Sequence, residues 1–114
     1  MINLTTDEFK KIFYDFTKNK EFSYSGTKPA IIDYHAQWCG PCKVIGPILE
    51  KLEEKGDFIL YKVDTDEEFE LAQLFNIRSI PTIYFVPVGG EPKHHVGAMS
   101  QSQVEKLIQK YFGE

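Results

Sequence analysis

Short apolar segments alternate with amphipathic segments along this chain of 114 residues, and this order is the strongest constraint on its fold. The apolar segments are rich in β-branched and aromatic residues, which is typical of β-strands. They cover residues 30–35, 58–63 and 82–86, and a weaker fourth segment covers residues 93–96. Nearly continuous apolar runs indicate strands that are buried on both faces. The alternation predicts an α/β fold in which helices flank both faces of a central mixed β-sheet.

Capping boxes mark the starts of three predicted helices. Apolar residues at helical spacing follow each box, and the first helix is expected to run to Phe16. A further helix should follow Cys42, and Pro47 within it should introduce a kink. Asn76 is expected to end the third helix in a left-handed conformation. The three boxes are Thr5 with Glu8, Thr65 with Glu68, and Ser100 with Gln103.

The composition is that of one ordinary globular unit, and we expect a single domain over residues 1–114. A net charge of −4 makes nucleic acid and anionic membrane surfaces poor partners. No apolar run approaches the roughly 20 residues of a membrane span. The first residues lack the basic and apolar regions of a signal peptide. We therefore expect a cytoplasmic protein, with an exported protein whose signal has been removed as the alternative.

Both cysteines of the chain lie in the segment Trp38-Cys39-Gly40-Pro41-Cys42-Lys43. The preceding strand should end near residue 36, which places Cys39 at the start of a helix. Unpaired amide groups and the positive end of the helix dipole favour a thiolate there. Cys39 is therefore predicted to be an exposed nucleophile. Cys42, one turn further on, is predicted to be a buried resolving thiol.

Three other interpretations of the cysteine pair are possible. A zinc site would need a second pair of ligands, and the three histidines of the chain do not have the spacing of one. A structural disulfide between near neighbours would close a very short loop and constrain little chain entropy. Two unreactive buried thiols are the third possibility.

Two charged residues lie within the predicted strands. Asp33 lies in an apolar run, where an unpaired carboxylate would be costly, unless that strand end is frayed. Lys62 lies in the middle of another strand, where an ordinary solvated lysine is the alternative. Either residue can thus belong to a site or to the surface.

Several of these segments together resemble the thioredoxin family over almost the whole chain. The matching segments are Asp33, Ala36 to Lys43, Pro47, Lys62 to Asp66, Ile77 to Thr82 and Val96 to Ala98. The W-C-G-P-C-K motif with an I-P-T motif downstream is far more specific than two cysteines alone. The resemblance implies the thioredoxin fold.

The resemblance also implies roles for individual residues. Cys39 would attack, and Cys42 would resolve the mixed disulfide. Asp33 would be a buried carboxylate that accepts the Cys42 proton, and Lys62 would be its charge partner. Pro81 would be a cis-proline that faces the cysteines. The implied substrate-binding surface comprises Trp38, Gly40, Pro41, Ile80, Pro81, Gly97 and Ala98. Trp38 could equally be a core residue.

The chain departs most clearly from the family at His35, where an aromatic residue, commonly Trp, is usual. Asp33 and His35 alternate with Tyr34 along a strand, so both should face the cysteine helix. A protonated imidazole there would favour the Cys39 thiolate and make the protein more oxidising. A neutral imidazole would instead bond to a nearby backbone group.

The expected activity is that of a protein dithiol–disulfide oxidoreductase that needs no cofactor beyond the Cys39–Cys42 pair. The family resemblance implies disulfide-containing target proteins and a thioredoxin-reductase-type flavoenzyme as electron donor. The Gly40-Pro41 dipeptide resembles that of reducing members, whose potentials lie near about −270 mV. Two alternatives are an exported thiol reductase dedicated to a few targets, such as those of cytochrome maturation, and a binding module with incidental cysteines.

Overall fold

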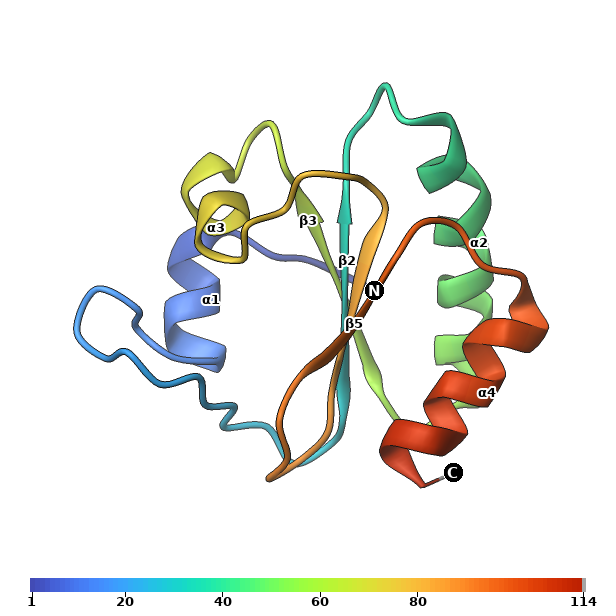
Figure 1. The fold of residues 1–114 in the computed structure, drawn as a ribbon. Coiled ribbons are helices and arrows are strands. Elements are labelled where there is room, and N and C mark those ends of the chain that lie inside the picture. The colour runs from blue at the N-terminus through green and yellow to red at the C-terminus, as the bar shows by residue number, and fades with distance from the viewer. Residues whose placement is uncertain (114) are drawn as a thin grey trace.

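A computed structural model describes residues 1–113 as a five-stranded mixed sheet with helices on both faces. Figure 1 shows α1 and α3 on one face of the sheet and α2 and α4 on the other. The predicted α/β architecture, with a mixed sheet covered on both faces, is confirmed. The elements in chain order are β1 Ile2–Asn3, α1 Thr6–Ile12, β2 Ala30–His35, α2 Gly40–Lys55, β3 Ile59–Asp64, α3 Phe69–Leu74, β4 Thr82–Val86, β5 Lys93–Val96 and α4 Gln101–Phe112.

The strand order is β1-β3-β2-β4-β5, with parallel pairing from β1 to β2 and antiparallel pairing from β2 to β5. The central strands β2 and β4 span the predicted residues, whereas β3 begins one residue later than expected. The two-residue strand β1 was not predicted, because two residues are too few to show a period. Within residues 1–113, no helix is long and apolar enough to cross a bilayer.

Alternate residues of β2 belong to two separate cores. Ile31 packs with residues of α2 and α4, while Ile32 and Tyr34 pack with residues of α1 and α3. Because side chains alternate along a strand, Asp33 and His35 share the face of Ile31 and point toward α2. The register of the central strand therefore brings both residues to the helix that carries the cysteines.

Helix α1 is shorter than its apolar pattern predicted. The capping box of Thr5 and Glu8 is present, but the helix ends at Ile12 rather than Phe16. Both the backbone N–H and the hydroxyl of Ser25 donate hydrogen bonds to the Ile12 carbonyl, at 3.2 and 2.6 Å. A separate turn, in which Asp15 accepts the Thr17 N–H, then redirects the chain. The ring of Phe16 still packs on Phe9, with centroids 6.1 Å apart, and is partly buried against the core on this face of the sheet.

The predicted capping box of Thr65 and Glu68 is wrong. Helix α3 begins at Phe69 without a side-chain cap, and the Thr65 hydroxyl donates to the His35 carbonyl at 3.1 Å. The Glu68 carboxylate instead accepts hydrogen bonds from the N–H and hydroxyl of Thr6, at 2.7 and 3.0 Å. Partners distant in sequence have therefore replaced the local cap. Asn76 has a φ of 53°, which confirms the predicted left-handed residue after this helix.

Candidate active site

The cysteine pair lies at the N-terminus of α2. Cys39 is the N-cap residue, and its sulfur accepts the backbone N–H of Cys42 at 3.2 Å. Pro41 occupies the first turn, where no intrahelical hydrogen bond needs its missing N–H. The sequence therefore gives a helix start at which free amide groups and the helix dipole favour negative charge on the Cys39 sulfur.

A disulfide joins Cys39 and Cys42. The prediction of an exposed Cys39 beside a buried Cys42 is wrong for this state, because their exposed fractions are 4% and 6%. The capping geometry turns the Cys39 sulfur inward, where the cysteines pack with Ala36 and the partly buried Ile80. The sulfur lies 3.8 Å from the Ile80 carbonyl oxygen. The Cys39–Cys42 pair is thus shielded from most of the solvent.

The loop before β4 closes over the pair. The Ile80–Pro81 peptide bond is cis, as the resemblance implied, and Pro81 is buried. Its carbonyl accepts the N–H of Gly97 at 2.8 Å, which holds the residues after β5 beside it. Gly97 has a φ of 100°, a conformation that strongly favours glycine. Ile80 therefore contacts Cys39, and Gly97 is held beside the neighbouring Pro81.

The other residues predicted for substrate binding lie at the surface. Gly40, Pro41 and Ala98 are exposed, and Trp38 exposes 70% of its surface. The alternative of a core tryptophan is therefore wrong. The Trp38 indole N–H donates a hydrogen bond to Asp66 at 2.9 Å. Asp66 ends the segment Lys62 to Asp66 that resembles the family, and no local pattern pointed to this contact.

Asp33 is a buried carboxyl group beneath α2. It is 0% exposed, and neither of its oxygens has a hydrogen-bond partner within residues 1–113. Desolvation is the main cause that raises the pKa of Asp33 to about 7, with a further upward contribution from Glu50 and an opposing one from Lys62. The alternative of a frayed strand end is wrong. A carboxyl group of this kind can hold or release a proton near neutral pH.

Lys62 is the register partner of Asp33 on β3. It is half-buried, and its ammonium nitrogen reaches α2, where a Cβ added to Gly46 would lie 3.4 Å away. Among residues 1–113, no ion pair within 4.0 Å joins Lys62 to Asp33. Lys62 therefore lowers the pKa of Asp33 through space and not by direct contact. The sequence did not reveal this approach of Lys62 to α2.

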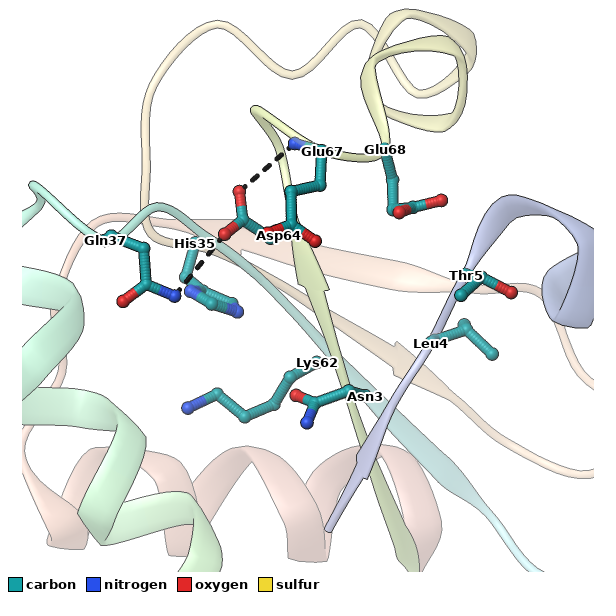
Figure 2. A pocket seen from close by; sticks show the side chains of 9 residues that line it. All are labelled: Asn3, Leu4, Thr5, His35, Gln37, Lys62, Asp64, Glu67 and Glu68. Carbon is teal, nitrogen blue, oxygen red and sulfur yellow. Dashed lines mark hydrogen bonds between the residues drawn. The ribbon is translucent and has the colours of Figure 1, made fainter.

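His35 is half-buried at the end of β2 and lines a cavity of about 250 Å³ together with Cys42 and Lys62. Desolvation and then Lys62 lower the pKa of the imidazole, while Asp64 opposes them. The neutral form is therefore favoured at neutral pH in this disulfide form, in which Cys39 carries no thiolate charge. Figure 2 shows His35 near Gln37, whose amide lies 3.5 Å from the Asp64 carboxylate.

The family model Thioredoxin matches residues 2–110. Thioredoxin of Borreliella burgdorferi is 44% identical over 114 residues, which cover 98% of this chain and 97% of that protein. An M-type chloroplastic thioredoxin of Spinacia oleracea is 40% identical over 94 residues, or 81% of this chain, and the match spans 52% of that protein.

A solved structure gives the same result. Reduced Schistosoma mansoni thioredoxin pre-protein superposes with a TM-score of 0.74 at 35% identity, and the match covers 97% of each chain. The matched residues include the cysteine pair at the start of α2 and the cis-proline loop before β4. Proteins of this family exchange dithiols for disulfides with disulfide-containing proteins. The chain belongs to the thioredoxin family and is a dithiol–disulfide oxidoreductase with the redox-active pair Cys39 and Cys42.

Proposed function

We propose that the protein reduces disulfide bonds in target proteins, with Cys39 as the nucleophile and Cys42 as the resolving thiol. The observation that carries this proposal is the position of the Cys39 sulfur, which caps α2 and accepts the Cys42 N–H at 3.2 Å. In the reduced protein the same N–H stabilises a Cys39 thiolate, whereas Cys42 lies inside the first turn.

The reaction proceeds in two exchanges. The Cys39 thiolate attacks one sulfur of the target disulfide and forms a mixed disulfide, while the other target sulfur leaves as a thiolate. Cys42 then attacks the Cys39 sulfur, and the second target sulfur leaves. Asp33 accepts the proton of Cys42 in this step, directly or through water. Its burial supports the role, because a pKa of about 7 lets it gain and lose a proton at neutral pH.

Lys62 tunes this proton acceptor. Its charge opposes the desolvation that raises the pKa of Asp33, so an appreciable fraction of Asp33 is ionised at neutral pH. No direct ion pair is needed for this effect, since charges interact through a poorly solvated interior over several ångströms.

The surface around the disulfide binds the target as an extended segment. Ile80 precedes β4, and its backbone pairs with that segment, as in recognition by strand addition. Trp38 supplies apolar area, and the buried Pro81 supports the loop from below. The remaining docking residues are Gly40, Pro41, Gly97 and Ala98, of which all but the half-buried Gly97 are exposed.

A protein that reduces others must itself be kept reduced. We propose a thioredoxin-reductase-type flavoenzyme as the electron donor and the cytoplasm as the compartment, because a reducing compartment sustains such a cycle. The donor supplies electrons to the Cys39–Cys42 disulfide, and the chain requires no bound cofactor of its own.

A redox titration of the Cys39–Cys42 pair against glutathione, combined with insulin reduction driven by a general thioredoxin reductase, tests the proposal. A reductant should have a potential near about −270 mV and should reduce insulin rapidly. A potential above about −200 mV would instead indicate an oxidant. Slow insulin reduction would indicate a reductase dedicated to a few targets. Partner binding that survives in Cys39→Ser, without any reduction of partners by the wild type, would indicate a binding module.

A further inference from the structure

The burial of Asp33 raises the question of how its proton reaches solvent. Only the ionised carboxylate can accept the Cys42 proton, yet a group with a pKa of about 7 is protonated in about half of the molecules at neutral pH. Asp33 is 0% exposed and has no hydrogen-bond partner within residues 1–113, so it has no direct route to bulk water. Molecules that start with a protonated Asp33 need an intermediate group.

Two cavities of about 250 Å³ each share lining residues at the end of β2, two positions after Asp33. The α2 cavity lies against Cys42 and Gly46, and the strand-end cavity lies between residues 3–5 and the ends of β2 and β3. Both are lined by His35, Gln37 and Lys62. Figure 2 shows these three on one side of the strand-end cavity, with Thr5 and Glu68 on the other. Each cavity has room for several water molecules, since one occupies about 30 Å³ in the liquid.

Of the β2 residues, which the structure describes in full, His35 alone lines both cavities. The two residues are two positions apart on the same face of β2, so their backbones lie about 7 Å apart. Lys62, the register partner of Asp33, extends from the neighbouring strand into the α2 cavity. An ammonium group only donates hydrogen bonds, whereas a neutral imidazole can accept a proton at one nitrogen and release one at the other.

We propose that His35 carries protons between the buried Asp33 carboxyl group and solvent, by way of water in the α2 cavity and the strand-end cavity. The proposal rests on the function of Asp33 given above. Before the resolving step, a protonated Asp33 passes its proton through water to His35, and the imidazolium releases it to solvent. The Asp33 carboxylate then takes the Cys42 proton, the Cys42 sulfur bonds to Cys39, and the bond from Cys39 to the target breaks. The departing target thiolate takes a proton from solvent.

The charges around His35 suit this role. Desolvation and Lys62 lower the pKa of the imidazole, and Asp64 partly opposes them, so His35 is mostly neutral at neutral pH and can accept a proton. The surrounding charged groups also include Asp33 on β2, Lys43 and Glu50 on α2, and Glu67 and Glu68 before α3. The acidic groups around the strand-end cavity attract the departing proton.

Single-turnover oxidation of the reduced protein by a peptide disulfide, quenched with acid, tests the proposal. In His35→Ala, the resolving step should show a slow phase whose amplitude is larger at pH 6 than at pH 8, because more Asp33 is protonated at pH 6. This phase should be about tenfold slower than in wild type. The effect is smaller than the 10²–10⁴-fold of a group at the reacting atoms, because His35 acts through Asp33. Added imidazole, which fits the vacated space, should accelerate the slow phase.

Two control variants separate proton transfer from packing. His35→Gln keeps a polar side chain in place but does not titrate, so it should show the slow phase without rescue by imidazole. His94→Ala removes an exposed histidine of β5 and should behave as wild type. If His35→Ala matches wild type at both pH values, or if imidazole fails to accelerate its slow phase, the proposal is wrong.

Asp33→Asn distinguishes failure of this proposal from failure of the proposed function. This variant should resolve mixed disulfides slowly at all pH values and show no pH-dependent slow phase. If the resolving step is slow in Asp33→Asn but normal in His35→Ala, the proton path through His35 is wrong while the role of Asp33 stands. If the resolving step has its normal rate in Asp33→Asn, the role of Asp33 as proton acceptor is wrong as well.

Discussion

The indole N–H of Trp38 donates a hydrogen bond to the Asp66 carboxylate at 2.9 Å, although 70% of the Trp38 surface is exposed. The bond joins the residue before Cys39 to the turn that leads into α3. It therefore fixes the orientation of a large apolar ring at the edge of the disulfide, and an oriented ring loses less conformational entropy when a target binds.

Replacing Asp66 with alanine should weaken the reduction of protein targets more than the reduction of small disulfides. Loss of one exposed hydrogen bond, about 1 kcal/mol, should lower kcat/KM for insulin about fivefold, mainly through KM. Reduction of a small aromatic disulfide, which needs no extended docking surface, should change by less than about twofold. The neighbouring variant Glu67→Ala leaves the ring bonded and serves as the control. Equal losses with both substrates would show that the bond does not orient Trp38 for docking.

The buried Asp33 makes stability depend on pH. Its folded pKa of about 7 exceeds the unfolded value of about 3.9, so the protein is most stable, with respect to this group, below pH 4. This contribution is lost as pH rises from 4 to 7, and it amounts to about 4 kcal/mol at 1.4 kcal/mol per pH unit. In Asp33→Asn this contribution to the pH dependence of the free energy of unfolding should be absent between pH 4 and pH 7.

Urea unfolding of the oxidised protein at several pH values measures this effect. The free energy of unfolding of Asp33→Asn minus that of wild type should increase between pH 4 and pH 7 and then level off. Asp57→Asn removes an exposed carboxylate that pairs with Lys28 at 3.5 Å, and its difference from wild type should stay nearly constant. A constant difference for Asp33→Asn would mean that the carboxyl group is not desolvated.

The contact between Glu68 and Thr6 should stabilise the attachment of α1 to the start of α3. The carboxylate accepts two hydrogen bonds at the start of the helix, where the N–H of Thr6 has no intrahelical partner. Glu68→Ala should lower the free energy of unfolding by about 2 kcal/mol, as expected for hydrogen bonds to a charged group. Glu67→Ala, an exposed neighbour, should cost less than about 0.5 kcal/mol. Similar costs for both variants would contradict the importance of this contact.

Much of the fold could be predicted because local and tertiary preferences agree. Strands β2 and β4 combine β-branched residues with burial on both faces, so their limits were recovered in full. Helix α4 begins with the predicted capping box of Ser100 and Gln103, since its first turn has no competing tertiary partner among the contacts of residues 1–113.

The errors arose where a partner distant in sequence prevailed over a local one. The Thr65 hydroxyl bonds to His35 and Glu68 bonds to Thr6, so neither was free to cap α3. Ser25 takes the last carbonyl of α1, which ends that helix before Phe16. Sequence patterns report only on residues that are close along the chain. These contacts could not be predicted from them, because they depend on how separate elements pack.

The sequence predicted which residues form the active site better than it predicted how deeply they are buried. The cysteines, Asp33 and the cis Ile80–Pro81 bond lie where the family motifs place them. The burial of Cys39 was not foreseen, because a helix N-terminus indicates charge stabilisation but not how the loop before β4 covers the sulfur. The exposure of individual atoms depends on packing between segments that are far apart in sequence.

Trapping of the mixed disulfide tests the central assignment most directly. Reduced Cys42→Ser and Cys39→Ser variants are each incubated with a disulfide-containing protein, and the products are identified by mass spectrometry of the intact adducts. Cys42→Ser should accumulate a stable adduct through Cys39, because the resolving thiol is absent, whereas Cys39→Ser should form little. Accumulation of the adduct in Cys39→Ser, with none in Cys42→Ser, would contradict the assignment of Cys39 as the attacking thiol.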